Sequence, residues 1–494
     1  MISSWKNYIQ WISLSCIALY SGILRFYHLG AQSLWIDEGF SINAAQAVLK
    51  KGVPILDSGF FYYVHIDSTY LIAFCMKLFG FSVWNPWSAR LLAAMSGIAF
   101  ILVIYFVTKK LTKSVLAALT SACIFALYDW QIAWSRQARG YMLAQLFFTI
   151  ALFFFLKWIE GFRNKDAFYC LLTLFLATLA QSSVVVFIPA FFIAGLIHLT
   201  THNKITNKIS VILFILTIIG FLIIPFLPFV TISNYFLQYA ILIFNHIPVL
   251  VVGLCIAIIL GLFFNEQKIT LAGIILIISY ILLSKYSPAL QLRYIVPLMP
   301  LIVSLYVYTF FILSRLFIQN IKSLDGEKTA LIIKGIFYTV AIILLMHHIV
   351  IKPRDTYTLE FGSPQPDFAA AYSYIQKTSR TSDVIISEYP VLTNLYLNKK
   401  GTWLPISLTG RLEEINEKTI HGTDRYVAAP RIYSAIDLQN ILTQQKGYVV
   451  FDTLAFARLS PEYISLIRSK TEEVYSARFD DYVASVRKFP PVIK

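Results

Sequence analysis

Long apolar segments recur along the first 350 residues, and they limit the folds open to this chain. Each is close to the ~20 residues that an α-helix needs to cross a lipid bilayer. Of the 494 residues, 58% are hydrophobic and 14% charged, and the mean hydropathy is +0.68. We therefore predict a polytopic α-helical membrane protein. No small-residue cleavage site follows the first apolar run, residues 8–24, so we expect this run to be kept as the first helix.

The basic residues suggest which loops face the cytoplasm. We expect eleven crossings, near residues 8–27, 91–108, 114–128, 141–158, 167–180, 184–200, 209–230, 247–264, 269–284, 295–314 and 330–350. Lysine and arginine gather in alternate loops, at Lys109, Lys110, Lys113, then Lys157, Arg163, Lys165, then Lys204, Lys208, then Arg315, Lys322, Lys328. The positive-inside rule makes these loops and the N-terminus cytoplasmic. If one long tilted helix ran across residues 181–183, every later loop would lie on the opposite side of the membrane.

With this topology, four polar segments face outward: residues 28–90, 129–140, 285–294 and everything after 351. Short loops and the lack of retention or lipidation signals favour a prokaryotic plasma membrane. Cytoplasmic loops account for much of the net charge of +15, so we expect a lipid bilayer and no nucleic acid as partner. The outer segments carry seven further cations, namely Lys50, Lys51, Arg90, Arg136, Arg139, Lys285 and Arg293.

An acidic pair, Asp37-Glu38, lies just after the first apolar run. Cations beside a carboxylate pair suit a site that holds an anionic lipid phosphate. The residues after Asp37 have a helical pattern that ends at Gly52, and a second short helix is expected between Ser68 and Gly80. Asp37 has an alternative reading as the N-cap of the first of these helices, with Glu38 as a first-turn acid favoured by the helix dipole.

Several motifs resemble those of a known family. They are Leu34-Trp35-Ile36-Asp37-Glu38-Gly39, Gly52-Val53-Pro54, Lys77-Leu78-Phe79-Gly80, Ser88-Ala89-Arg90-Leu91, Trp134-Ser135-Arg136-Gln137-Ala138-Arg139-Gly140-Tyr141, and Leu292-Arg293-Tyr294-Ile295-Val296-Pro297 with Pro300. In this order they resemble the GT-C superfamily of polyprenyl-phosphate-sugar glycosyltransferases, which includes protein O-mannosyltransferases, lipid A aminoarabinose transferases and RgtA/B/C/D-like enzymes. The chain departs from the family at His65-Ile66-Asp67, where His-Pro-Pro is usual, and at Gln137, where glutamate is common.

The resemblance implies an inverting transfer of a sugar from a polyprenyl-phosphate donor to a hydroxyl of a glycan, lipid or protein at the outer face. A phosphate leaving group needs charge stabilisation more than a proton, so one base and a cationic clamp suffice. The implied catalytic residues are Asp37, as the base, and Glu38, which orients Asp37 or the acceptor. The implied substrate-binding residues are His65, Asp67, Arg90, Arg136, Arg139, Tyr141, Lys285 and Arg293, with Arg139 and Arg293 foremost for the lipid phosphate.

Other readings of these residues stay open. The arginines could anchor helix ends at the membrane interface, Tyr141 could belong to an aromatic belt, and His65 with Asp67 could be ordinary loop polarity. A divalent metal at His65 and Asp67 is conceivable, but no cofactor or metal is indicated. A transporter or lipid flippase, or a non-catalytic membrane subunit, is the alternative function. Transporters usually carry ionisable groups at mid-membrane in two related halves, whereas here the charges lie in loops.

The chain changes character after residue 352, so we divide it into a transmembrane domain, 1–352, that includes the catalytic outer loop 28–90, and an extracytoplasmic α/β domain, 353–494. Helices are expected at Pro366–Ser379, at Ser434–Lys446 with Ser434 as N-cap, and at Ser460–Lys470 with Pro461 in the first turn. Strands are expected at Asp383–Ser387, Arg425–Ala429, Gly447–Asp452, Glu473–Arg478 and Tyr482–Lys488. This domain could select or cover the acceptor, or be a structural cap.

Overall fold

A computed structural model describes residues 2–202, 234–287, 290–320, 327–359, 365–406, 415–416, 418–479 and 482–489. The chain divides into two units. The first consists of Met1–Tyr27, Ala93–Arg136 and Gly140–Tyr357, and the second of His28–Leu92, Gln137–Arg139 and Thr358–Lys494.

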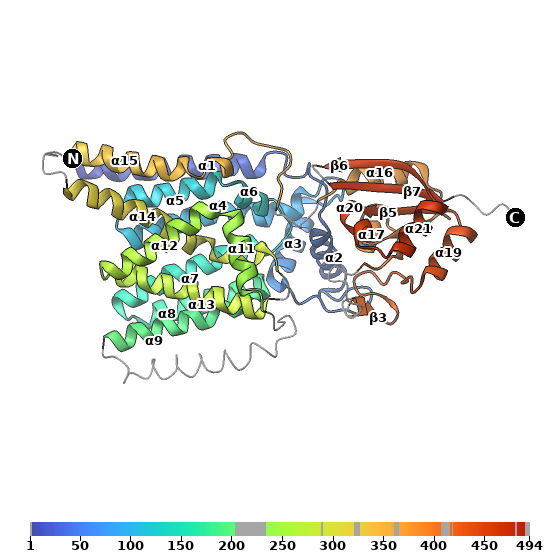
Figure 1. The fold of residues 1–494 in the computed structure, drawn as a ribbon, viewed down its shortest axis with the longest axis horizontal. Coiled ribbons are helices and arrows are strands. Elements are labelled where there is room, and N and C mark those ends of the chain that lie inside the picture. The colour runs from blue at the N-terminus through green and yellow to red at the C-terminus, as the bar shows by residue number, and fades with distance from the viewer. Residues whose placement is uncertain are drawn as a thin grey trace. The chain divides into compact units, whose positions relative to one another are not determined.

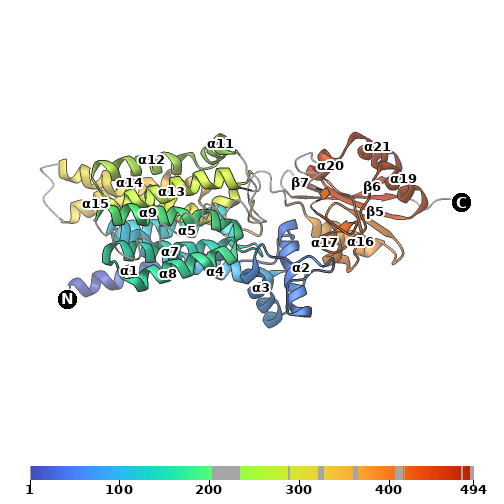
Figure 2. The same ribbon diagram turned by 90° about the horizontal axis from the view of Figure 1, so that it is seen from below.

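The first unit is helical. Its α-helices are α1 (Ile2–Phe26), α4 (Trp87–Thr112, whose first residues belong to the second unit), α5 (Val115–Leu127), α6 (Asp129–Ser135), α7 (Tyr141–Gly161), α8 (Asn164–Ala180), α9 (Ile188–Thr201), α11 (Phe236–His246), α12 (Pro248–Phe263), α13 (Gln267–Tyr286), α14 (Met299–Asn320) and α15 (Glu327–Ile343). Short 3-10 helices are η1 (Ser182–Phe187), η3 (Leu292–Leu298) and η4 (Met346–His348). Helices α7, α8, α9 and α13 lie side by side (Figures 1 and 2).

Among the described residues, six helices are long and apolar enough to cross a membrane, and a bent pair of helices would be a seventh if it forms one span. The six are Tyr8–Phe26, Trp87–Thr112, Tyr141–Gly161, Ser182–Thr201, Gln267–Tyr286 and Leu292–Gln319. The bent pair, α11 and α12, turns through 111° just before Pro248, where a helix can begin but not continue through. The prediction of a polytopic helical membrane protein is confirmed.

The local signals in this unit explain where helices begin and end. The Ser114 hydroxyl accepts a hydrogen bond from the Ala117 amide at 3.2 Å and so caps the start of α5. The expected break at residues 181–183 is present, since α8 ends at Ala180 and η1 begins at Ser182. The predicted crossing at 209–230 lies outside the described residues.

The second unit combines the loop helices α2 (Ile36–Lys51) and α3 (Ile66–Phe79) with a mixed α/β region. Its five-stranded sheet has the order β2-β1-β5-β7-β6, with β1 parallel to β2 and β5, and β7 antiparallel to β5 and β6. The strands are β1 (Val384–Ser387), β2 (Thr402–Trp403), β5 (Gly447–Asp452), β6 (Glu472–Phe479) and β7 (Tyr482–Phe489), and a small hairpin joins β3 (Thr419–Ile420) to β4 (Thr423–Asp424). The helices are α16 (Phe368–Thr378), α17 (Pro390–Leu397), α19 (Ala435–Gln444), α20 (Thr453–Arg458) and α21 (Pro461–Lys470).

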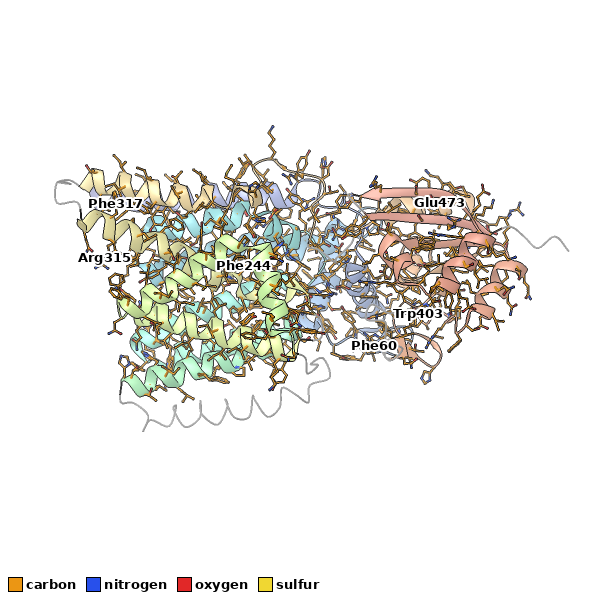
Figure 3. The ribbon with its side chains drawn as sticks, viewed as in Figure 1. Phe60, Phe244, Arg315, Phe317, Trp403 and Glu473 are labelled. Atoms are coloured by element: carbon orange, nitrogen blue, oxygen red, sulfur yellow. The ribbon has the colours of Figure 1, made fainter. Side chains whose placement is uncertain are left out.

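Each face of this sheet has its own core, because neighbouring residues of a strand point to opposite faces. Val449 and Phe451 of β5 pack with α19, α20 and α21 on one face. Tyr448 and Val450 pack on the other face with α16 and α17 and with apolar residues of α2 and α3, and Trp403 belongs to this second core (Figure 3). The loop helices therefore share a hydrophobic core with the C-terminal sheet.

Most predicted elements of the C-terminal region are confirmed. Ser434 and Ser460 cap α19 and α21, and Pro461 occupies the first position of α21. The strand predicted at Arg425–Ala429 is wrong. Those residues form a tight turn, because the Asp424 side chain accepts a hydrogen bond from the Val427 amide at 2.8 Å and the Ala428 amide donates to the Asp424 carbonyl at 3.0 Å.

Candidate active site

The acidic pair lies in the first turn of α2. The helix begins at Ile36 after the N-cap residue Trp35, so the alternative reading of Asp37 as N-cap is wrong. The capping hydrogen bond comes instead from Glu38, whose Oε2 accepts from the Trp35 amide at 3.1 Å. The helix ends as predicted, with Gly52 in the left-handed conformation at φ 77°. Glu38 therefore satisfies the helix end, and the carboxylate of Asp37 is not used as the cap.

Glu38 is fully buried and forms a bidentate ion pair with Arg90. Arg90 Nε lies 2.8 Å from Oε1 of Glu38, and Nη2 lies 2.8 Å from Oε2. The Ala138 amide also donates to Oε1 at 2.8 Å. The remaining Arg90 contacts are to the carbonyls of Leu29, Gln32 and Ser33. This network, which we call the Glu38 anchor (Glu38, Arg90 and the amides of Trp35 and Ala138), joins three distant chain segments around the start of α2.

Asp37 faces Arg139. Arg139 Nη2 is 3.6 Å from Asp37 Oδ2, and Nη1 donates to the Asp37 carbonyl at 2.9 Å, to Ser41 Oγ at 3.1 Å and to Tyr62 Oη at 3.1 Å. The side chains of Asp37 and Arg139 are 16% and 7% exposed, so the carboxylate keeps more access to solvent than its partner. The hydrogen bonds of Nη1 fix the guanidinium of Arg139, and its positive charge faces the Asp37 carboxylate. The structure thus brings together Asp37, the expected base, and Arg139, an expected ligand of the lipid phosphate.

The negative charge of Asp37 contributes to the raised pKa of two tyrosines from the C-terminal region, Tyr389 and Tyr426. Burial raises the pKa of Tyr426 to about 12, and the Asp37 carboxylate contributes to the rise, while Arg425 opposes it. Burial also raises the pKa of Tyr389, with Asp452, Glu388 and Asp37 adding to the effect. Sequence reasoning missed Tyr62, Tyr389 and Tyr426. The aromatic run at residues 60–63 could have indicated Tyr62, but no local signal marks the other two.

His65 and Asp67 lie at the start of α3. The His65 carbonyl accepts hydrogen bonds from the hydroxyls of Ser68 and Thr69. The centroid of the His65 imidazole ring lies 6.2 Å from the centroid of the Tyr62 ring. Asp67 accepts from the Ser68 amide, and burial raises its pKa to about 6. Among the described residues, no three or more His, Cys, Asp or Glu side chains gather closely enough to hold a metal ion.

The other four candidates belong to the first unit. Arg136 is buried and donates to the carbonyls of Arg25 at 3.1 Å, Tyr27 at 2.6 Å and Asp355 at 3.1 Å. Tyr141 begins α7 and its ring lies 4.7 Å from that of Trp134. Lys285 is exposed in the last turn of α13, and Arg293 lies in η3 beside the ring of Tyr294.

Part of the chain is similar in sequence to known proteins. Residues 68–230 match the family described as dolichyl-phosphate-mannose-protein mannosyltransferase. An uncharacterized protein of Aquifex aeolicus (strain VF5) is 28% identical over 162 residues, which are 32% of this chain and 31% of that protein. The chain therefore spans about a third of the length of that curated relative.

Solved structures share the fold over most of the chain. ArnT from Cupriavidus metallidurans in the apo state superposes with a TM-score of 0.56 and 14% identity, covering 98% of both chains. The same protein bound to undecaprenyl phosphate gives a TM-score of 0.54 and 15% identity, covering 96% of this chain and 97% of that one. The Archaeoglobus fulgidus oligosaccharyltransferase tethered with an acceptor peptide gives a TM-score of 0.55 and 12% identity, covering 96% and 73%. Residues 68–230 are thus similar to the mannosyltransferase family, and the chain as a whole has the fold of ArnT.

Proposed function

We propose that the protein transfers a sugar, with inversion, from a polyprenyl-phosphate donor to an acceptor hydroxyl at the outer face of the membrane. The observation that carries this proposal is the Asp37–Arg139 pair, whose charged groups lie 3.6 Å apart beside the Glu38 anchor. The anchor makes the first turn of α2 rigid, and rigidity is what a base needs to meet a reacting hydroxyl at a fixed distance.

In the proposed reaction, the acceptor oxygen attacks the anomeric carbon as the bond from that carbon to the phosphate oxygen breaks. Polyprenyl phosphate leaves with the bonding electron pair, and the acceptor proton passes to the Asp37 carboxylate. Arg139 keeps that carboxylate in place and adds positive charge where the phosphate leaves. Glu38 and Arg90 then act by positioning, since their charged atoms are turned to each other.

The donor we propose is of the class found in the solved ArnT, which was bound to undecaprenyl phosphate. Arg293, Lys285 and Tyr141 remain our candidates for its phosphate, whereas the contacts of Arg136 favour a structural role. An apolar cavity of about 810 Å³ in the first unit is lined by residues from α11 to α14 and suits an isoprenoid chain. One of its lining residues, Phe244, is labelled in Figure 3.

We also propose the topology expected from the sequence: eleven crossings in a plasma membrane, a cytoplasmic N-terminus and an extracytoplasmic region from residue 353 onward. Helices α5, α8 and α15, which are 13, 17 and 17 residues long, would supply crossings beyond the longer spans. Single cysteines introduced at exposed positions and labelled with a membrane-impermeant reagent in intact cells test this topology. Labelling of Ile436→Cys, whose parent side chain is exposed, is expected without permeabilisation.

The experiment that tests the function offers purified protein a panel of radiolabelled undecaprenyl-phosphate sugars together with an envelope extract from cells that lack the protein. We expect label to move from the donor into the extract, in a product whose anomeric configuration is opposite to that of the donor. Label that crosses a vesicle membrane while still on its lipid, with no transfer to the extract, would favour the alternative of a transporter or flippase.

A further inference from the structure

A strained turn of the C-terminal region carries two side chains that the proposed mechanism does not use. The Asp424 amide donates to the Ala429 carbonyl at 2.9 Å and the Val427 amide donates to Asp424 Oδ2 at 2.8 Å, which closes the turn on both sides. Ala428 within it has φ 57°, in the left-handed region that costs energy for a residue with a Cβ atom. The turn, residues 424–429, therefore holds Arg425 and Tyr426 in one conformation.

This turn packs on the helix that carries Asp37. The rings of Tyr426 and Phe40 are stacked, with centroids 3.8 Å apart and planes 18° from parallel, and Asn43 Nδ2 donates to the Tyr426 carbonyl at 3.1 Å. Phe40 is three residues after Asp37 on α2, so the two side chains lie on neighbouring positions of one helix face. All of these residues belong to the second unit. Tyr426 is thereby held against Phe40, a residue one helical turn from Asp37.

The hydroxyl of Tyr426 is a prepared hydrogen-bond donor. Arg425 Nη2 donates to Tyr426 Oη at 2.9 Å, and the Arg425 guanidinium lies 5.0 Å from the centre of the Phe60 ring. A phenol oxygen that accepts from a cation still has its own proton to donate, and the charge strengthens that donation. A pKa of about 12 keeps this proton in place at neutral pH.

We propose that Tyr426 is an acceptor-positioning residue: its hydroxyl donates to an oxygen of the acceptor next to the attacking hydroxyl, and so holds that hydroxyl against Asp37. This inference rests on the proposed function. It gives the C-terminal region a direct part in acceptor recognition, through a residue 389 positions away from Asp37 in the chain (426 minus 37). Arg425 acts on the acceptor only through Tyr426.

The test compares Tyr426→Phe with the wild type, using the labelled undecaprenyl-phosphate sugar that the wild type uses and the envelope extract as acceptor. Phenylalanine keeps the ring that stacks on Phe40 and removes only the hydroxyl. Loss of one hydrogen bond to the acceptor predicts an about tenfold lower rate at limiting extract. The donor concentration for half-maximal rate and the thermal unfolding midpoint should stay unchanged. The matched control is Tyr433→Phe, whose parent side chain is 60% exposed and donates to the Gly422 carbonyl.

Three results would overturn the inference while leaving the proposed function intact: a wild-type rate in Tyr426→Phe, an equal loss in Tyr433→Phe, or a loss that comes with weaker donor saturation and a lower unfolding midpoint. The last of these would make Tyr426 a structural residue. Absence of transfer by the wild-type protein refutes the proposed function, and this inference with it.

Discussion

From the hydrogen bonds of the Glu38 anchor we predict how much the variant Glu38→Gln destabilises the start of α2. Each carboxylate oxygen of Glu38 accepts two hydrogen bonds: Oε1 from Arg90 Nε and the Ala138 amide, and Oε2 from Arg90 Nη2 and the Trp35 amide. Glutamine replaces one oxygen with an NH2 group, so two donors face a donor whichever way the amide turns. The guanidinium also loses its buried counter-charge. Breaking a buried ion pair in this way costs about 3–5 kcal/mol.

Amide hydrogen exchange on α2, measured by mass spectrometry on protein in detergent micelles, gives the free energy of local opening. We expect it to fall by about 3–5 kcal/mol in Glu38→Gln, which speeds exchange more than about a hundredfold. Asp57→Asn is the control, because Asp57 pairs with Lys51 at 3.4 Å with side chains 54% and 41% exposed, and such surface pairs contribute less than about 1 kcal/mol.

The double variant Glu38→Leu with Arg90→Met removes both charges at once. It should not restore the wild-type exchange rate, because the amides of Trp35 and Ala138 still lose their acceptor. Exchange in Glu38→Gln as slow as in Asp57→Asn would refute the claim that this network holds the start of α2.

Further predictions concern three other side chains. Arg139→Lys cannot contact Asp37, Ser41 and Tyr62 together, so its transfer rate should fall about 10- to 100-fold, and a rate above half of the wild-type value would contradict the positioning role. Arg136→Met removes the hydrogen bonds that Arg136 donates to the buried carbonyl of Arg25 and to the carbonyls of Tyr27 and Asp355, and should lower the thermal midpoint by at least about 5 °C. Lys285→Met, at an exposed position, should not. Burial raises the pKa of Asp424 to about 6 in the folded protein, above its ordinary value of 3.8. The folded state therefore binds the Asp424 proton more tightly than the unfolded state, and the free energy of unfolding falls as the pH rises from about 4 through about 6. Asp424→Asn should therefore gain stability relative to the wild type between pH 4 and pH 7.5, and equal midpoint differences at the two pH values would exclude this assignment.

Features set by local sequence could be predicted, because the residues that cause them are neighbours. Ser434, Ser460 and Pro461 mark helix starts by their own hydrogen-bonding and backbone properties, and Gly52 marks a helix end. The apolar runs indicate membrane helices for the same reason. The segment Arg425–Ala429 was predicted as a strand because Tyr426 and Val427 have a high strand propensity. It is a turn because the Asp424 side chain accepts a hydrogen bond from the Val427 amide.

The site itself depends on pairings that no local pattern reveals. Glu38 and Arg90 are 52 positions apart, and Glu38 and the Ala138 amide 100 positions apart. Arg90 was therefore selected as a substrate-binding candidate, although its guanidinium binds Glu38. Conversely, Tyr426 lies in a segment with no motif, and only the packing of α2 against the C-terminal sheet brings it to Asp37.

If Asp37 is the base that takes up the acceptor proton, the variant Asp37→Asn should lose transfer and keep its fold. Asparagine has nearly the same shape and retains an oxygen toward Arg139, but it cannot take up the acceptor proton. With the labelled donor at saturation, we predict that transfer falls at least about 100-fold while α2 hydrogen exchange stays as in the wild type. Transfer within threefold of the wild-type rate by a variant with unchanged exchange would contradict the account.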